Sequence, residues 1–469
     1  MGKRIVLGML AMVALLVSGC GAPDRPAQSG APAAVVPTAQ PPQPPQLTPV
    51  PGDELYVRDS EGSAAERLMI LSSTGGTSAR ELPLGAVAPD RSTLYTVESS
   101  PAGDGFKTRV RALDPKTGVQ VRETTIEGAY ILPTVSVDGM PGGLSPNGHW
   151  LVLRKVPGQT IGRSQSQFVV LDTAFAQPPR RVDLDIDGLY DFDGISNSGN
   201  GLYLIQYQSS PSLSLATPYL VRYYDMAQKL LDPQPIVAKG EDQVMAGTHH
   251  TSVPAPNGVW RYSLYMNNTY GPFIHALNLN DRFAICVDLP KEHMDDAGRQ
   301  MFWSLAVSPN GKKLYAANGA LGLITEINIS QDGLPEVQRS VTLPPAPSAG
   351  AGSLDGLAAL FAPPVAEAKP EHGDGIGGSV LSPDGKTLFA IGERGLLAIG
   401  TADLKEYRRY LPDVALSSVA LSADGKRLYT TDAGQGRIVV LDLATGAPLA
   451  EITGVRSPGS ILWVESQNT

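Results

Sequence analysis

The sequence predicts an all-β propeller, because one short phrase recurs seven times along the 469 residues. Each copy contains a small apolar run, a turn such as Ser-Pro-Asn-Gly, and then a β-rich run. A supersecondary unit that recurs every few tens of residues indicates a repeat architecture whose units stack on one another. The copies begin at Ala86, Gly143, Gly194, Val253, Ala306, Val380 and Ala420.

The most regular repeat, residues 417–454, predicts four antiparallel strands joined by short turns, which make one propeller blade. Its first strand is small and apolar, as the crowded axis of a propeller requires. Asp424 and Gly425 form the next turn, since both residue types tolerate positive φ. The following strand alternates apolar and polar residues, as a half-buried strand should. The four expected strands are residues 418–421, 427–431, 437–441 and 448–452.

The ends of the chain supply the parts of one further blade. Near the N-terminus, three segments match the second, third and fourth strands of a blade whose first strand is missing there: residues 54–58, 67–72 and 79–84. Near the C-terminus, residues 457–464 match the first strand of a blade, but no second, third or fourth strand follows them. Pairing the two ends would complete an eighth blade and close the ring. The strand pattern therefore favours eight blades slightly over seven, the commoner size, which stays the alternative.

The turn phrases and a second phrase, Leu-Asp-x-x-Thr-Gly, carry a family resemblance. The second phrase occurs in VRALDPKTGV at residues 110–119 and in VVLDLATG at residues 439–446. Together they resemble the YVTN-type and WD-like propellers of bacterial envelope proteins, over about residues 54–466. The resemblance implies the fold and leaves the activity open, because propellers host many unrelated functions.

The N-terminus is typical of an export signal. Lys3 and Arg4 precede an apolar run at residues 5–16 that is too short to span a membrane. Residues 17–20 (Val-Ser-Gly-Cys) resemble the lipobox of bacterial lipoproteins, which implies cleavage before Cys20 and lipidation of its thiol. An ordinary secretory signal with an incidental cysteine is the alternative.

A Pro-rich segment follows Cys20 and cannot bury a core. Residues 21–52 contain ten prolines, one Asp and one Arg, so we expect an extended tether. The organisation expected is a signal peptide over residues 1–19, a lipidated Cys20 with tether over 20–53, a propeller over 54–466 and a tail over 467–469.

Charge and cysteine content exclude several classes of function. The net charge of −9 provides no basic surface for nucleic acid, so we expect no nucleic-acid partner. An acidic propeller is also not expected to lie on anionic lipid, so we expect membrane contact only through the lipid on Cys20. The second of the two cysteines, Cys286, lies in a strand pattern and is expected to be a buried small residue. No Cys-x-x-Cys-His motif occurs, which excludes covalent c-type haem.

Three long loops that lead into blades contain four of the six histidines together with several carboxylates. This donor set could bind a transition metal near the axis, because imidazole and carboxylate suit such ions. Solvated loop histidines are the alternative, and adjacent histidines seldom point the same way. His275, by contrast, lies in a strand pattern that predicts a hydrogen-bonded strand residue. The loops are residues 239–251, 291–303 and 345–378, and the candidate ligands are His249, His250, His293 and His372.

A second candidate metal site matches the calcium-loop pattern D-x-D-x-D-G-x-x-D, in which hard oxygen ligands surround the ion. The β-branched Ile186 and the Gly194 at the twelfth position depart from that pattern. The alternation of acidic and apolar residues also predicts an amphipathic outer strand with its acids in water. The candidate calcium ligands are Asp183, Asp185, Asp187 and Asp191.

No catalytic signature accompanies these patterns, since the chain contains no Gly-x-Ser-x-Gly elbow, phosphate loop or dinucleotide fingerprint. We therefore expect a monomeric, lipid-anchored extracytoplasmic propeller that binds an envelope protein or a small ligand through one loop-rich face. One alternative is a metal-dependent hydrolase or lactonase that uses the histidine-bearing loops. Another is an accessory subunit of an envelope redox complex, by similarity to propeller subunits of amine-oxidising systems.

Overall fold

The structure is a computed structural model, and the chain divides into two compact units, Met1–Gln46 and Leu47–Thr469. Every strand and helix described here belongs to the second unit. No helix within the described ranges is long and apolar enough to cross a membrane. The structure describes residues 52–59, 66–74, 80–137, 139–156, 166–184, 189–207, 218–236, 245–267, 269–330, 334–344, 378–455 and 458–467.

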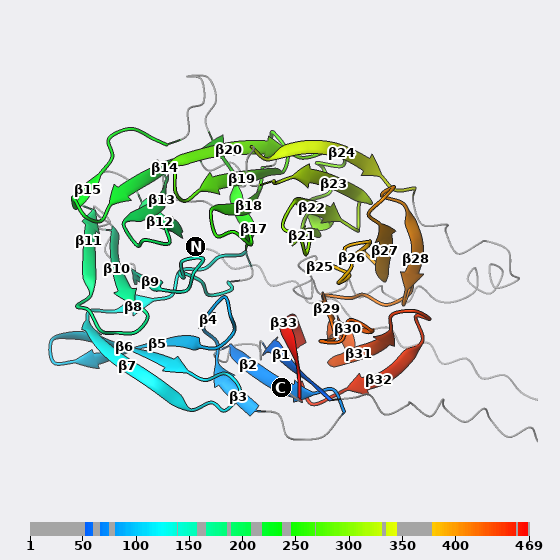
Figure 1. The fold of residues 1–469 in the computed structure, drawn as a ribbon, viewed down its shortest axis with the longest axis horizontal. Coiled ribbons are helices and arrows are strands. Elements are labelled where there is room, and N and C mark those ends of the chain that lie inside the picture. The colour runs from blue at the N-terminus through cyan, green and yellow to red at the C-terminus, as the bar shows by residue number, and fades with distance from the viewer. Residues whose placement is uncertain are drawn as a thin grey trace, which may run out of the picture. The chain divides into compact units, whose positions relative to one another are not determined.

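The second unit consists of eight antiparallel sheets that follow one another around a ring, here named blades 1 to 8 (Figure 1). Blade 1 has the strand order β3-β2-β1-β33 and so joins the two ends of the described chain in one sheet. The prediction of eight blades closed by both ends is confirmed. The strands of blade 1 are β1 (Asp53–Asp59), β2 (Arg67–Ser72), β3 (Arg80–Pro83) and β33 (Pro458–Ser466).

In blades 2 to 8 the strands occur in chain order, with the first strand of each blade innermost (Figure 1). Blade 2 contains β4 (Ala86–Val87), β5 (Leu94–Ala102), β6 (Gly105–Leu113) and β7 (Gln120–Glu127). Blade 3 contains β8 (Tyr130–Ile131), β9 (Trp150–Lys155), β10 (Ser166–Asp172) and β11 (Arg180–Leu184). Blade 4 contains β12 (Leu189–Ile195), β13 (Gly201–Tyr207), β14 (Pro218–Asp225) and β15 (Leu230–Leu231), and β16 (Met245–Ala246) also pairs with β14.

The remaining four blades follow the same plan, and a single turn of helix, α1 (Ala297–Gln300), precedes blade 6. Blade 5 contains β17 (Thr248–Pro254), β18 (Trp260–Met266), β19 (Phe273–Asn278) and β20 (Phe283–Asp288). Blade 6 contains β21 (Trp303–Val307), β22 (Lys313–Asn318), β23 (Leu323–Asn328) and β24 (Glu336–Thr342). Blades 7 and 8 contain β25 (Ser379–Leu381), β26 (Thr387–Ile391), β27 (Leu396–Gly400), β28 (Glu406–Tyr410), β29 (Ser418–Leu421), β30 (Arg427–Asp432), β31 (Arg437–Asp442) and β32 (Pro448–Ile452), with the 3-10 turn η1 (Ala433–Gln435) after β30.

The core lies between the blades, because each sheet is apolar on both faces. Successive strand residues point to opposite faces, so alternate residues pack on opposite neighbours. The described residues form a buried apolar cluster at each of the eight blade interfaces, including the one between blades 8 and 1. In blade 3, Leu151, Leu153, Val169 and Leu171 pack against blade 2, whereas Val152, Phe168 and Val170 pack against blade 4.

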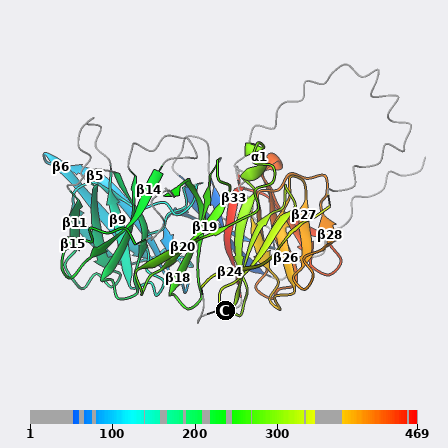
Figure 2. The ribbon, with the colours of Figure 1, turned by 90° about the horizontal axis from the view of Figure 1, so that it is seen from above.

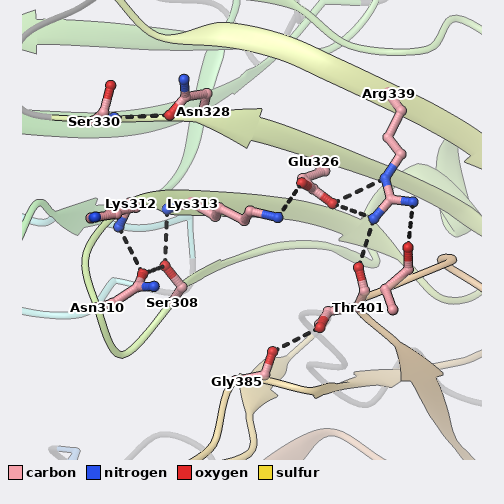
Figure 3. A network of polar contacts seen from close by, with 11 residues as sticks. Ser308, Asn310, Lys312, Lys313, Glu326, Asn328, Ser330, Arg339, Gly385 and Thr401 are labelled. Carbon is pink, nitrogen blue, oxygen red and sulfur yellow. Dashed lines mark hydrogen bonds and ion pairs between the residues drawn. The ribbon is translucent and has the colours of Figure 1, made fainter.

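The repeated Ser-Pro-Asn/Asp-Gly phrase forms the turn between the first and second strands. In blade 6, Ser308 Oγ donates to Asn310 Oδ1 (2.7 Å) and accepts from the backbone nitrogen of Lys313 (2.9 Å) (Figure 3). Gly311 has a φ of +67°, and a Cβ there would lie 3.2 Å from Pro256 Cγ in the preceding turn. The serine is therefore a turn residue, as predicted, and the same bonds recur at Ser145, Ser382 and Ser422.

A buried carboxylate adds a polar link between blades 6 and 7. Glu326 is 4% exposed and accepts hydrogen bonds from Lys313 Nζ (2.6 Å) and from Arg339 (2.6 and 3.0 Å) (Figure 3). Arg339 also donates to the carbonyl of Thr401 in blade 7 (2.6 Å). Burial opposes ionisation, but the hydrogen bonds from Lys313 and Arg339 lower the pKa of Glu326. Both carboxylate oxygens are occupied, so this network has a structural role.

A buried ion pair stabilises the interface between blades 8 and 1, where the ring closes. Asp53 in β1 is 2% exposed and accepts from Arg427 Nη2 (3.0 Å) and Tyr429 Oη (2.6 Å) in blade 8. On the other face of blade 1, the rings of Tyr56 and Trp463 stack with centroids 4.1 Å apart. The two chain ends are thus held together by backbone pairing, stacking and a charged contact.

Replacing the buried carboxylate should weaken the closure. We expect Asp53→Ala to lower the free energy of unfolding by about 3–5 kcal/mol, because it leaves a buried guanidinium without its main partner. Denaturant unfolding checks this, with Asp104→Ala at an exposed hairpin tip as the matched control. An equal effect of the two substitutions would contradict the role given to Asp53.

Candidate functional site

Each blade presents two kinds of connection at opposite ends of its strands. The turn between first and second strands lies at one end. The loop that leads into the first strand lies at the other, with the loop between second and third strands, because neighbouring strands are antiparallel. Helix α1 lies at this second end (Figure 2). This end is called the loop face below.

A segment of blade 3, described over residues 132–137 and 139–143, lies across the axis of the ring. Strand β8 ends at Ile131, and pairing with β9 resumes where the backbone nitrogen of Val152 donates to Gly143. Between these points Val137 donates to the carbonyl of His250 in blade 5 (2.8 Å). A Cβ at Gly139 would lie 4.0 Å from Arg58 Nη2 in blade 1.

Blades 1 and 5 are opposite one another in an eight-bladed ring. A segment that starts in blade 3 and approaches both must therefore pass through the centre, where Figure 1 shows it inside the ring between β9 and β17. Residues 132–137 and 139–143 are together named the axial segment below. The sequence pattern did not predict it, because its Gly and Pro content reads as an ordinary loop.

A buried charged cluster lies between blades 4 and 5. Asp193 sits at a β-bulge in β12, where the register against β13 shifts between Phe192 and Gly194. The carboxylate is 4% exposed, and its Oδ2 lies 3.2 Å from Nε2 of His275 in β19, which is fully buried. The prediction that His275 is a hydrogen-bonded strand residue is confirmed.

The two partners hold each other in their charged forms. Burial disfavours the imidazolium, but the Asp193 carboxylate outweighs it and raises the pKa of His275 to about 9. Burial likewise opposes ionisation of Asp193, but His275 and then Arg261 lower the pKa of its carboxyl. The pair is therefore ionic near neutral pH.

The adjacent histidines His249 and His250 lie in strand β17 and not in the entering loop to which the prediction assigned them, and they point to different partners. His249 Nε2 lies 2.7 Å from Ser252 Oγ, and its ring packs on Tyr265. Burial, followed by the charge of Arg261, lowers the pKa of His249 to about 3, so this imidazole is neutral. His250 is 1% exposed and bonds through Nε2 to the carbonyl of Trp303 in blade 6 (2.9 Å).

The remaining candidate metal ligands are only partly described. His293 is exposed in the turn before α1, with a φ of +59°. Within the described part of the chain, no three His, Cys, Asp or Glu side chains are placed to hold a metal ion. His372 lies outside the described residues, so the four-histidine site as a whole stays a prediction.

The calcium pattern is also only partly described. Asp183 is an exposed residue of β11, between the buried Val182 and Leu184, which is the amphipathic outer strand expected as the alternative. Asp191 lies in β12, where its Oδ1 is 3.6 Å from Arg154 Nη1. Asp185 and Asp187 lie outside the described residues, so calcium binding stays a prediction.

The Arg154–Asp191 pair forms the accessible edge of the charged cluster. Their side chains are 23% and 30% exposed, in contrast to Asp193. Burial is the main cause that raises the pKa of Asp191, and the opposing charge of Arg154 lowers it.

Two aspartates at alternate positions of the otherwise apolar β12 were the only sequence signal for this cluster. The partners Arg154, Arg261 and Tyr265 come from other strands and carried no such signal.

The cluster is poorly suited to proton transfer near neutral pH. An efficient general acid or base has a pKa close to the working pH. His275, with a pKa of about 9, holds its proton, and His249, with a pKa of about 3, hardly accepts one. The arrangement offers fixed charges and hydrogen-bonding groups, which suit recognition.

Comparisons with known proteins give similarity of fold only. No family model matches the chain, and no curated protein sequence matches it. Apo AztD from Citrobacter koseri is 12% identical, with 88% of this chain and 98% of that one covered, at a TM-score of 0.47. The periplasmic gluconolactonase PpgL from Pseudomonas aeruginosa is 15% identical, with 78% and 97% covered, at a TM-score of 0.38. A putative 6-phosphogluconolactonase from Bacteroides fragilis is 15% identical, with 80% and 98% covered, at a TM-score of 0.36.

The raised pKa of His275 predicts a loss of stability in mild base. The folded state holds this proton up to pH of about 9, whereas an unfolded histidine releases it near 6.5. The stabilisation is complete below pH 6.5 and is lost as the pH rises through 9. We therefore expect the melting temperature to fall over this range, and His275→Gln to flatten the fall.

The matched control is His149→Gln, which replaces an exposed histidine and should leave the pH profile unchanged. Calorimetry of the three proteins from pH 6 to about 10 makes the comparison. A His275→Gln profile parallel to that of the unmodified chain would contradict an ionic Asp193–His275 pair.

Proposed function

We propose that this propeller is a binding module whose loop face recognises an envelope protein or a small polar ligand. The observation that supports it best is the charged cluster of blades 3 to 5, whose accessible edge is the Arg154–Asp191 pair. Arg154 supplies donors and Asp191 supplies acceptors, so the pair favours a ligand that carries both kinds of group.

The surrounding structure supports a rigid recognition surface. Arg154 and Asp191 lie on β9 and β12, neighbouring strands of blades 3 and 4 that are anchored by Val152, Phe192 and Ile195 in the apolar core. A binding group on a strand loses little conformational freedom when a ligand arrives. The axial segment follows Ile131, the cross-strand partner of Arg154, and so borders the same region.

The proposal includes a location outside the cytoplasm, with the chain tethered through a lipid on Cys20. Its support is the N-terminal sequence, in which a basic start and an apolar run precede the Val-Ser-Gly-Cys motif. A diacylated and N-acylated cysteine would bind a membrane stably, because two or more chains are needed for firm anchoring. A tether of Pro-rich chain would then separate the propeller from the lipid surface.

Removing the accessible charged pair should strongly weaken capture of the ligand. We expect the double substitution Arg154→Ala/Asp191→Ala to reduce recovery of the binding partner from envelope extracts by about tenfold or more. The matched control is Arg109→Ala/Glu123→Ala, which removes an ion pair from the outer strands of blade 2. Quantitative mass spectrometry of the recovered material measures the effect.

A partner recovered equally by both variants would contradict recognition at the Arg154–Asp191 pair. Metal analysis of the same purified chain separates this function from metal-dependent hydrolysis. Stoichiometric zinc or another transition metal that is lost in His249→Ala/His293→Ala would favour the hydrolase instead.

A further inference from the structure

Two exposed apolar side chains lie on the same face of blade 3 as Arg154. Ile131 in β8 is the direct cross-strand partner of Arg154, so both side chains point to one face of the sheet. Val156 follows Arg154 by two positions and shares that face, because its backbone nitrogen continues the pairing by donating to the carbonyl of Ala129. Ile131 is 37% exposed and Val156 is 40% exposed. The guanidinium is therefore bordered by accessible aliphatic surface.

This face of blade 3 is directed at blade 4. Val152, two positions before Arg154 in β9, packs in the apolar cluster between the two blades. Alternate residues of a strand point the same way, so Arg154 and Ile131 are directed at blade 4 as well. The approach of Arg154 to Asp191 of β12 agrees with this direction.

The Arg154–Asp191 pair keeps much of its hydrogen-bonding capacity. Nη1 and Oδ1 are 3.6 Å apart, which is beyond hydrogen-bond distance. The Arg154 side chain makes no hydrogen bond to any other described residue, and its Nε is buried without a partner. Asp191 uses Oδ1 to accept from the backbone nitrogen of Phe192 (2.9 Å), and its Oδ2 accepts from none of the described residues.

Other ion pairs of similar or lower exposure are closed by direct hydrogen bonds. In each of them the guanidinium donates to the carboxylate at 2.9–3.0 Å, as a charge-assisted hydrogen bond should. The Arg154–Asp191 pair differs from them in its length and in its free donors and acceptors. The three pairs compared are Arg427–Asp53, Arg437–Asp432 and Arg409–Glu406.

A cation and an anion held this close together match a ligand that carries both charges on neighbouring atoms. A guanidinium binds a carboxylate through parallel N–H donors, and a carboxylate accepts hydrogen bonds from an ammonium group. A ligand with only one of these groups would leave Arg154 or Asp191 partly buried without a hydrogen bond, which is costly. An α-amino acid carries both groups on one carbon, and its side chain leaves from the same carbon.

We propose that the loop face binds a free α-amino acid with an aliphatic side chain. Arg154 binds the α-carboxylate, Asp191 binds the α-ammonium group, and Ile131 and Val156 contact the side chain. A peptide lacks one of the two charges at each of its termini, so the free amino acid is the favoured ligand. This inference rests on the proposed function, because it names the ligand class of the same site.

Isothermal titration calorimetry of the purified full chain tests the ligand class without any substitution. The probes are L-leucine, leucinamide without the carboxylate, 4-methylpentanoate without the ammonium group, and glycine without the side chain. We expect one leucine to bind per chain, and each of the other three probes to bind at least about tenfold more weakly.

Substitutions then locate the site. Arg154→Ala and Asp191→Asn should each weaken leucine binding by about tenfold or more. Ile131→Ser should reduce the preference for leucine over glycine, because it removes apolar contact alone. The matched control is Arg109→Ala, which removes another long ion pair, with Arg109 Nε 3.7 Å from Glu123 Oε2, and should leave leucine binding unchanged.

Three results would overturn the proposal. One is the lack of saturable leucine binding up to about 10 mM. Another is an equal affinity for leucine and for either analogue that lacks a charge. The third is an unchanged affinity for leucine in both Arg154→Ala and Asp191→Asn. The analogue series uses the native chain, so the proposal stays testable if a variant fails to fold.

Failure of this inference can be told from failure of the proposed function. Capture of a partner that depends on Arg154 and Asp191, in a chain that does not bind leucine, would overturn the amino-acid class alone. Equal capture by the native chain and by Arg154→Ala/Asp191→Ala would instead remove recognition at this site.

Discussion

The pairing of β1 with β33 is the contact on which the rest of the structure depends. Every blade is apolar on both faces, so none is stable until a neighbour covers each face. The apolar faces of the first and last blades are covered because the two chain ends pair in one sheet, which makes these blades neighbours. Tyr56 pairs with Trp463 there, and Asp53 binds Arg427 across the last interface. A ring without this contact would expose two large apolar faces to water.

Closure also explains why the polar chemistry lies between blades. A blade interior offers few positions for charge, but a blade interface brings residues from distant parts of the chain together. Asp193 and His275 are 82 positions apart in sequence, yet they meet because blades 4 and 5 are neighbours. The bulge in β12 turns Asp193 toward its partner. Fixed charges held in this way suit recognition.

The fold was largely predictable from sequence, because the repeat is a local pattern. The Ser308 turn and the orphan strands at the two ends follow from residue type and spacing alone. The charged cluster was not predictable in this way, since Arg154, Asp193 and His275 come from three blades. The axial segment was missed for another reason: its Gly and Pro residues are typical of an ordinary loop, and the repeat pattern of blade 3 was recognised only from Gly143 onward. The separate directions of His249 and His250 agree with the expectation that adjacent histidines seldom point the same way.

Hydrogen exchange measured by mass spectrometry at β1 and β33 tests the closure most directly. The account predicts that the amides of Leu55 and Val57 exchange as slowly as those of the middle strands of blade 3. It also predicts that both become fast in a chain ending at Val455, which lacks β33. Rapid exchange of β1 in the full chain, or unchanged protection after removal of β33, would contradict a ring closed by its two ends.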